Sequence, residues 1–338
     1  MYTYRPLLES REIRLLHLLP GQFGENIQCM LAHKSLTELP QYFAVSYTWG
    51  APELAREVEV DGITIPVREN LFQLLRHLRQ PYSSLVLWID ALCVDQSSIP
   101  EKNIQVPLMG QIYSFAKSVF VWLGLHADGS EHLFDSGPVD NQFQLKCGGG
   151  TPGLSTSIST TVATDASGSL YTRAYWTRTW IVQEIVLASR VDVFCGDRFC
   201  NWYFFIGHTC EKSEYDRTAS DYAIRNIVAF RNMGQRMPLR CLLFRFHMTR
   251  CFDPRDLVYS LLNIAADTRD QDHGITVDYS SSIETLFVQT LAFCSAPSCI
   301  TVFGQAGGRA IECLRFCDTL AARLGLDWNQ VLILHRMR

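Results

Sequence analysis

Four side chains that can carry charge or hydrogen-bond a ligand follow one apolar segment of the chain. Leu85 to Ile89 is continuously apolar, and Asp90, Asp95, Gln96 and Glu101 come directly after it. A continuous apolar run of this length is typical of an inner strand of a parallel sheet. Ligands of open α/β sheets bind beyond the carboxyl ends of such strands. Because burying an unpaired charge is costly, these carboxylates need a ligand or a structural partner.

The segments around these residues are predicted to alternate between strands and helices. Apolar runs predict strands at 42–47, 85–89 and 119–123, and apolar residues at helical spacing predict helices at 70–78 and 101–116. This order predicts an α/β fold in which crossover helices connect parallel strands. The acidic residues then lie at one edge of the sheet.

Side-chain types predict how these two helices begin and which face each one buries. Asn70 is expected to cap the first helix, and Pro107 predicts a kink or a late start in the second. The face expected to be buried comprises Leu71, Leu74, Leu75 and Leu78 in the first helix and Ile104, Leu108, Ile112 and Phe115 in the second.

Hairpins and further helices are expected around this core. Two strands are expected within 11–31, and the turn dipeptides Asp61-Gly62 and Gly196-Asp197 predict two hairpins. The hairpin strands are expected at 57–60 with 63–67 and at 191–195 with 198–202. Helices are then expected at 176–187, from Asp253-Pro254 to about Ile264, and at 281–293.

Composition shifts divide the chain into four parts. Residues 1–125 are predicted to form the N-terminal α/β core, and residues 126–170 a flexible Gly/Ser/Thr-rich insertion. Residues 171–295 continue the domain as a mainly helical part, and residues 296–338 form a poorly patterned C-terminal segment.

Charge and composition exclude several classes of function. The net charge of −4 argues against binding to nucleic acid or to an anionic membrane surface. No apolar run approaches the length of a membrane span, and charged residues interrupt 1–20, so neither a membrane span nor a signal peptide is expected. A cytoplasmic location is therefore predicted. The twelve cysteines form no Cys-x-x-Cys pair, and the nine histidines complete no zinc pattern, so no metal site and reduced thiols are expected.

Short blocks spread along most of the chain resemble, in their order, the fungal heterokaryon-incompatibility (HET) domain. Two departures from the family pattern are Val94, where isoleucine is usual, and Lys102, where arginine is common. The blocks are Arg14-Leu-Leu with Leu19-Pro-Gly21, Tyr42 to Gly50, Asp61-Gly62, Asn70-Leu71, Trp88 to Gln96, Glu101, Gln105, Met109, Ile112-Tyr113, Val121 to Gly124, Arg178, Trp180, Gln183-Glu184, Asp253 to Asp256 and Asp278 to Ser280.

This resemblance implies a fold and a biological role. HET domains are remotely similar to TIR domains, so the core is expected to be a TIR-like (flavodoxin-like) parallel sheet with added hairpins and a largely helical C-terminal part. HET domains are effectors of programmed cell death in fungal non-self recognition. Some TIR domains cleave NAD at the nicotinamide–ribose bond. The resemblance therefore implies NAD as a possible substrate, with no cofactor.

Cleavage of that bond passes through an oxocarbenium-like state, which a carboxylate stabilises. Glu101, at the start of a helix after an inner strand, is the expected catalytic carboxylate; alternatively it only stabilises the helix N-terminus. Asp95 and Asp90 are expected to hold ribose hydroxyls or orient Glu101; alternatively they cap the loop. The carboxylates thus remain open to a catalytic and a structural interpretation.

Five further residues are candidates for binding the substrate. Ser46, Tyr47 and Trp49 end the first core strand and are expected to line the crevice, with Trp49 stacking on a base. Gln96 and Gln105 are expected to hydrogen-bond an amide or a hydroxyl. The alternative is that Trp49 is a core aromatic and that the two glutamines tie the loop to its helix.

Two further residues and two further functions remain as alternatives. Glu184 is a second acidic candidate, expected to pair with Arg178 or Arg173, and Cys93 is expected to be a buried thiol. Instead of an enzyme, the chain is interpreted as a non-catalytic signalling module that self-associates or docks an incompatible allelic or signalling partner. A degenerate family member without activity is the third interpretation.

Overall fold

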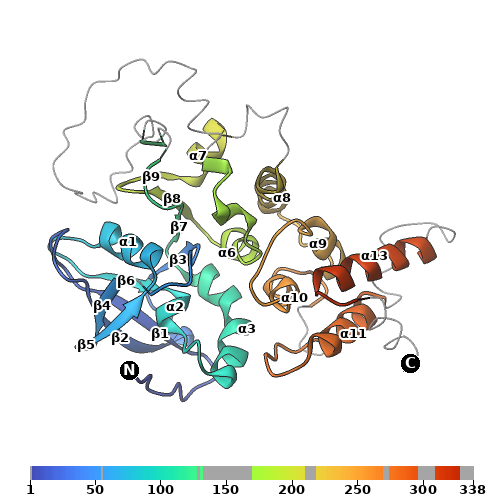
Figure 1. Cartoon of the computed structure of the whole chain (residues 1–338), viewed down its shortest axis with the longest axis horizontal. Coiled ribbons are helices and arrows are strands. Elements are labelled where there is room, and N and C mark those ends of the chain that lie inside the picture. The colour runs from blue at the N-terminus through green and yellow to red at the C-terminus, as the bar shows by residue number, and fades with distance from the viewer. Residues whose placement is uncertain are drawn as a thin grey trace. The chain divides into compact units, whose positions relative to one another are not determined.

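The computed structural model describes residues 2–54, 56–127, 130–131, 170–209, 218–268, 274–295 and 309–327. The chain divides into two compact units, whose elements are labelled in Figure 1. The first comprises Met1–Gln96, Gln111–Trp176 and Ala188–Asp221, and the second comprises Ser97–Gly110, Thr177–Leu187 and Tyr222–Arg338. The predicted four-part division stays a prediction. Most of the predicted insertion at 126–170 lies outside the described residues.

Nine strands of the described residues form one sheet in the first unit. Their order across the sheet is β5-β4-β2-β1-β6-β3-β7-β8-β9. The strands are β1 (Glu12–Leu18), β2 (Gln28–Ser35), β3 (Phe43–Tyr47), β4 (Arg56–Val60), β5 (Ile63–Val67), β6 (Leu85–Trp88), β7 (Val119–Trp122), β8 (Val191–Cys195) and β9 (Arg198–Asn201).

The centre of the sheet is parallel, as the alternation of strands and helices predicts. β3 pairs in parallel with β6 and with β7, and β7 pairs in parallel with β8. The four neighbours β6-β3-β7-β8 therefore follow the chain order second, first, third, fourth, which is the start of the flavodoxin-like order. β6 is antiparallel to β1 on its other side, with Leu16 opposite Leu87, so the whole sheet is mixed.

Two glycine turns close the predicted hairpins. Asp61 and Gly62 both have positive φ, 51° and 80°, as a type I′ turn requires, and β4 and β5 pair antiparallel on either side. Gly196 has a φ of 55° and joins the antiparallel strands β8 and β9. Both hairpin predictions are confirmed.

Buried apolar side chains stabilise both the sheet and the helix that follows β5. α1 (Glu69–Leu78) buries the four leucines that its periodicity indicates. Each contributes roughly 1.5–3 kcal/mol of hydrophobic free energy. Phe120 on β7 stacks at 4.5 Å from Phe43 on β3 and lies 4.8 Å from Phe194 on β8, measured between ring centroids. The parallel strands are therefore joined by side-chain packing as well as by their backbone ladders.

The predicted cap of α1 is wrong. The N-cap position is Arg68, and no side chain caps the helix there. Asn70 lies one residue inside the helix instead, where its side chain bonds to residues that end two strands. The Asn70 side chain makes tertiary hydrogen bonds instead of the local capping bond that its residue type favours at a helix N-terminus.

The buried face of the next long helix is also rotated from the predicted one. α3 (Ile99–Phe115) starts two residues before the prediction, and Ile104 and Phe115 are 49% and 39% exposed. The residues that are buried recur at helical spacing, which makes them one face of the helix. They are Gln105, Leu108, Met109, Ile112 and Tyr113.

The second unit is helical in its described residues. The helix predicted at 176–187 is shorter: a 3-10 turn at Ala174–Thr177 precedes α6 (Ile181–Val186), and Arg178 between them forms a β-bridge with Arg250. Asp253-Pro254 precedes α10 rather than opening it. Besides α3 and α6, the described helices that lie in this unit or mostly in it are α8 (Ala219–Met233), α9 (Leu239–Arg245), α10 (Asp256–Leu262), α11 (Ile283–Cys294) and α13 (Arg309–Arg323).

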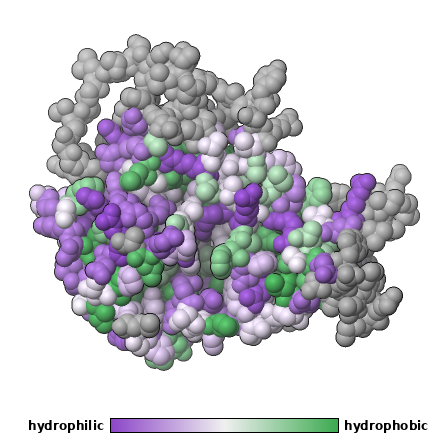
Figure 2. Space-filling model, viewed as in Figure 1, coloured by the Kyte–Doolittle hydropathy of each residue, from purple (hydrophilic) through white to green (hydrophobic). Residues whose placement is uncertain are grey.

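Two surface properties bear on function. Every helix in the described residues falls short of the length and apolarity that a membrane crossing requires. On the face shown in Figure 2, apolar and polar residues intermingle over the described part of the surface.

The remaining described elements of the first unit are α2 (Asp90–Cys93), α7 (Trp202–Thr209) and a 3-10 turn at Leu36–Glu38.

Two isoleucines of α3 test the observed helix face. Ile112 is fully buried, whereas Ile104 is 49% exposed. Ile112→Ala is expected to lower the free energy of unfolding by about 2–5 kcal/mol, because it leaves a cavity. Ile104→Ala is expected to lower it by less than about 1 kcal/mol. Chemical denaturation of the full chain measures both, and equal losses would contradict the observed face.

Candidate functional site

Asp90 follows β6 and is held by two hydrogen bonds. Its Oδ2 accepts from Nε1 of Trp49 at 2.9 Å, and its Oδ1 accepts from the backbone N of Ala91 at 2.7 Å. Trp49 follows β3, so this side-chain pair joins the carboxyl ends of two neighbouring parallel strands. Both oxygens of Asp90 are thus engaged, as its loop-capping interpretation predicts.

The rest of this loop is tied to the same residue. Nε2 of Gln96 donates to the backbone oxygen of Asp90 at 2.8 Å, which is the structural role weighed for Gln96. Asp95 is half-buried and has contacts of its own. The loop after β6 is therefore a defined structure rather than a row of unpaired carboxylates.

Trp49 is half-buried and carries a cation on its ring. The guanidinium carbon of Arg68 lies 5.1 Å from the centre of the Trp49 ring, and Nη1 of Arg68 donates to the oxygen of Gly50 at 3.2 Å. A guanidinium over an indole is a favourable cation–π contact. An aromatic ring, a cation and a carboxylate thus gather beyond the end of β3.

Asn70 bridges the neighbouring pair of strand ends. Its amide donates to the oxygen of Thr48, which follows β3, and its Oδ1 accepts from Nε1 of Trp122 at 2.9 Å, at the end of β7. In the flavodoxin-like order, the gap between these two strands is the switch point at which ligands bind. Asn70 therefore lies at the place where the topology predicts a ligand.

Ser46 and Tyr47 lie deeper than the predicted crevice. They are 1% and 2% exposed, and Oγ of Ser46 lies 2.6 Å from the hydroxyl of Tyr175. Both side chains are part of the packed core of the first unit. Their predicted role in ligand binding stays a prediction.

Glu101 and Gln105 are described with the second unit. Glu101 is half-buried in the first turn of α3, where its backbone N donates to Oγ of Ser98 at 3.3 Å. Asn103 fixes this turn, because its amide donates to Oδ1 of Asp278 at 3.0 Å and accepts from the N of Tyr279 at 2.8 Å. Gln105 is 1% exposed. The backbone that carries Glu101 is therefore firmly placed.

The segment around Asp253 contains a local ion pair. Asp253 accepts from Nη2 of Arg255 at 2.8 Å. Burial alone would raise the pKa of Asp253, but the hydrogen bonds and the charge of Arg255 outweigh burial, so the pKa is lowered. Hydrogen bonds from Ser280 and Ser281 hold the pKa of Asp278 far below its usual range. These acids are ionised and structurally engaged.

Asp256 is a buried acid with two hydrogen-bond donors. The hydroxyl of Tyr279 donates to its Oδ1 at 2.6 Å, and Trp180 also bonds to it. Burial raises the pKa of Asp256 to about 6, although both hydrogen bonds lower it. The sequence pattern places this aspartate inside the helix predicted from Asp253-Pro254 and gives it no role of its own.

The second acidic candidate is paired, as expected. Glu184 is 1% exposed and lies 3.5 Å from Nη1 of Arg178. Gln183 accepts from Nδ2 of Asn263 at 3.0 Å. A buried acid with an arginine partner is a structural arrangement.

Comparisons with known proteins identify a family that part of this chain matches. Residues 42–184 match the model of the heterokaryon incompatibility protein (HET) family. Residues 42–184 form a HET domain. A stretch of 154 residues is also 37% identical to the heterokaryon incompatibility protein 6, OR allele, of Neurospora crassa. That alignment covers 41% of this chain and 23% of the relative, so the chain spans about a quarter of the relative's length.

No solved structure matches the chain. The HET domain comprises the parallel strands β3, β6 and β7 and the residues Trp49, Asp90, Asp95 and Glu101. Its mixed α/β architecture agrees with the prediction, and its TIR-like identity stays a prediction. Recognition of the family from its sequence blocks is confirmed.

One cluster, which lies partly inside the matched residues, was missed by sequence reasoning. His126 follows β7, and Cys195 and Asp197 end β8 and begin the next turn, just past the matched residues. Nε2 of His126 lies 3.0 Å from Oδ1 of Asp197, and Nη1 of Arg173 donates to Sγ of Cys195 at 3.4 Å. The only signal was a cysteine and an aspartate flanking a glycine at a strand end.

The remaining chemical predictions concern thiols and metals. Cys93 in the HET domain is fully buried, and burial raises the pKa of its thiol to about 12, so it is the buried thiol that was expected. In the described residues, no group of three or more His, Cys, Asp or Glu side chains is placed to hold a metal ion.

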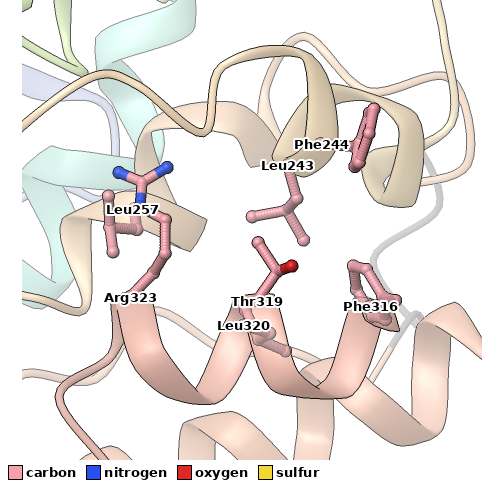
Figure 3. A pocket seen from close by; sticks show the side chains of 7 residues that line it. All are labelled: Leu243, Phe244, Leu257, Phe316, Thr319, Leu320 and Arg323. Atoms are coloured by element: carbon pink, nitrogen blue, oxygen red, sulfur yellow. The ribbon is translucent and has the colours of Figure 1, made fainter. Parts of the chain in front are cut away.

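A small pocket lies outside the HET domain, in the second unit. Figure 3 shows that α13 presents Phe316, Thr319, Leu320 and Arg323 to Leu243 and Phe244. The Arg323 guanidinium is used inside the fold, where it donates to backbone oxygens of Phe246 and Thr249. The pocket is therefore an apolar packing gap without convergent polar groups.

The Asn70 bridge of the HET domain can be tested by stability. Asn70→Ala is expected to lower the free energy of unfolding by about 1–3 kcal/mol, because Thr48 and Trp122 lose their partner. Asn26→Ala is the matched control, since its side chain is exposed, and it should change stability by less than about 0.5 kcal/mol. Chemical denaturation measures both, and a neutral Asn70→Ala would contradict the bridge.

The buried Asp256 predicts a specific pH dependence. Its folded pKa of about 6 exceeds the ordinary 3.8, so between those values the folded state holds a proton that the unfolded state has lost. Stability from this group therefore falls as pH rises through the window, by about 3 kcal/mol. Asp256→Asn removes that titration.

The measurement is unfolding of Asp256→Asn and the unmodified chain at pH 4 and pH 7. The variant is expected to gain about 2 kcal/mol relative to the unmodified chain between the two pH values, because part of the effect is already present at pH 4. A stability difference that is the same at both pH values would contradict the raised pKa of Asp256.

Proposed function

We propose that this protein acts in heterokaryon incompatibility, as an effector of programmed cell death after non-self recognition in the cytoplasm. The observation that carries the proposal is the HET domain at residues 42–184, together with 37% identity to an incompatibility protein of Neurospora crassa. Because the chain spans 23% of that relative, the proposal concerns what a HET domain does.

The chemistry proposed for the domain is hydrolysis of NAD at the nicotinamide–ribose bond. Nicotinamide leaves as a neutral base from a cationic pyridinium, so the reaction needs no general acid. It needs a carboxylate that stabilises the positive charge developing on the ribose. The flavodoxin-like order of β6-β3-β7-β8 supports this proposal, because a TIR-like core requires that order.

Glu101 is the proposed carboxylate. It is half-buried rather than fully hydrated, and the bonds of Ser98 and Asn103 hold the turn that carries it. A fixed charge stabilises a transition state better than a mobile one, because no reorganisation is needed during the reaction. Asp95 and Asp90 remain the proposed ligands of ribose hydroxyls.

The end of β3 offers groups suited to the rest of the dinucleotide. Trp49 supplies an aromatic face for a base, and Arg68 beside it supplies the cation that a pyrophosphate pairs with. Gln96 and Gln105 remain the proposed hydrogen-bonding residues for an amide or a hydroxyl, and Ser46 and Tyr47 from β3 remain proposed to line the crevice.

A non-catalytic signalling module is the second candidate, and one observation favours it. Both oxygens of Asp90 and the amide of Gln96 are used in bonds that fix the loop after β6. In that case the domain signals by self-association or by docking an allelic or signalling partner, and its acids only maintain the fold.

Nicotinamide release from NAD by the full chain separates the two candidates. The unmodified chain, tested across a range of protein concentrations, is expected to release nicotinamide, and Glu101→Gln is expected to reduce the rate about 100-fold or more. Glu284→Gln is the matched control, because Glu284 is also a half-buried acid in the first turn of a helix of the second unit.

The control should retain full activity. Absence of nicotinamide release at every concentration would contradict the enzymatic proposal. A Glu101→Gln variant that folds, releases no nicotinamide and still kills cells would instead establish the signalling module.

A further inference from the structure

The ends of β7 and β8 bring a thiol, an imidazole, a carboxylate and a guanidinium together within the first unit. Sγ of Cys195 accepts from Nη1 of Arg173 at 3.4 Å and lies 3.5 Å from Oγ of Ser130. The imidazole of His126 bonds to Cys195 and, through Nε2, lies 3.0 Å from Oδ1 of Asp197. The arrangement is a thiol paired with a base that a carboxylate orients.

Backbone geometry at Gly196 makes this arrangement possible. Gly196 has a φ of 55°, which L side chains rarely adopt, and a Cβ at this position would lie 2.4 Å from Cδ2 of His126. The glycine therefore lets the imidazole approach the turn between Cys195 and Asp197. Arg173 is held in place because its Nη1 also donates to the oxygen of Leu123 at 2.6 Å.

The surrounding charges favour the thiolate. Burial on its own would raise the pKa of Cys195, but the bond from His126 and the positive charge of Arg173 outweigh it, and the pKa is lowered. The pKa of His126 is raised, first by its bond to Cys195 and further by Asp197, although burial opposes this. Both pKa shifts are in the direction that moves the proton from the sulfur toward the imidazole, as in activated cysteines.

Other buried thiols of the described residues show the opposite behaviour. Burial raises the pKa of Cys29 and of Cys93 to about 12, and neither has an imidazole bonded to it. The chain therefore contains built-in reference thiols against which the reactivity of Cys195 is measured.

We propose that Cys195 is a site of oxidation by hydrogen peroxide and other small hydroperoxides. The thiolate sulfur attacks one peroxide oxygen, an S–O bond forms and the O–O bond breaks. Cys195 is oxidised by two electrons to a sulfenic acid. The hydroxide that leaves takes the proton of the His126 imidazolium and becomes water, so the peroxide is reduced and atoms and charge balance.

Access to the sulfur selects a small oxidant. Cys195 itself is fully buried, whereas the side chains of His126 and Asp197 are 23% and 56% exposed. A peroxide molecule is about the size of two waters, and larger thiol reagents are disfavoured. Nη2 of Arg173 is buried without an acceptor among the described residues, so a donor is available for the oxygen that the sulfur gains.

The test is site-resolved oxidation of the folded full chain. The protein is treated with hydrogen peroxide, the peroxide is removed with catalase, and the chain is unfolded in urea containing dimedone, which traps sulfenic acids. Mass spectrometry then gives the oxidised fraction of each cysteine, including any sulfinic acid. Cys195 is expected to oxidise at least about tenfold faster than Cys29 and Cys93.

His126→Asn is expected to slow oxidation of Cys195 about tenfold or more. Its matched control is His33→Asn, because His33 also pairs with a carboxylate at 3.0 Å, that of Glu12. Should His126→Asn fail to fold, Asp197→Asn replaces it, since Asp197 is exposed, and a several-fold slowing is expected. Oxidation of Cys195 no faster than that of Cys93, or a folded imidazole or carboxylate variant with an unchanged rate, would overturn the proposal.

Discussion

Hydrogen bonds between side chains that follow neighbouring strands hold the carboxyl edge of the parallel sheet together. Asp90 binds Trp49 across the ends of β6 and β3, and Asn70 connects the end of β3 with that of β7. Backbone ladders stop at these positions, so polar side chains must satisfy one another or water. The edge at which an α/β sheet binds ligands is therefore a defined polar surface in this protein.

This constraint limits what each acid of the HET domain can do. Both carboxylate oxygens of Asp90 already accept hydrogen bonds from Trp49 and Ala91. Asp90 is therefore better suited to fixing the positions of these residues than to binding a new ligand. Glu101 lies in a turn that is fixed by its backbone bond to Ser98 and by the side chain of Asn103. Among these acids, Glu101 is therefore the strongest candidate for catalysis, because Ser98 and Asn103 hold the turn that carries it.

Local patterns predicted the elements of this fold better than they predicted side-chain roles. Asp61-Gly62 predicted its hairpin because a type I′ turn depends only on residues next to each other. Asn70 failed as a helix cap because its partners Thr48 and Trp122 come from strands far away in the sequence. The buried face of α3 was rotated for the same reason, since tertiary packing decides between two adjacent stripes of apolar residues. His126 and Cys195 are 69 positions apart, so no spacing rule could join them.

Binding of NAD at the carboxyl edge is the central claim, and hydrogen–deuterium exchange with and without NAD tests it most directly. The account predicts slower exchange in the segments after β3 and β6, residues 48–50 and 90–96, with no change in the hairpin at residues 56–67. Unchanged exchange at residues 48–50 and 90–96 under saturating NAD, or protection confined to the hairpin, would contradict the account.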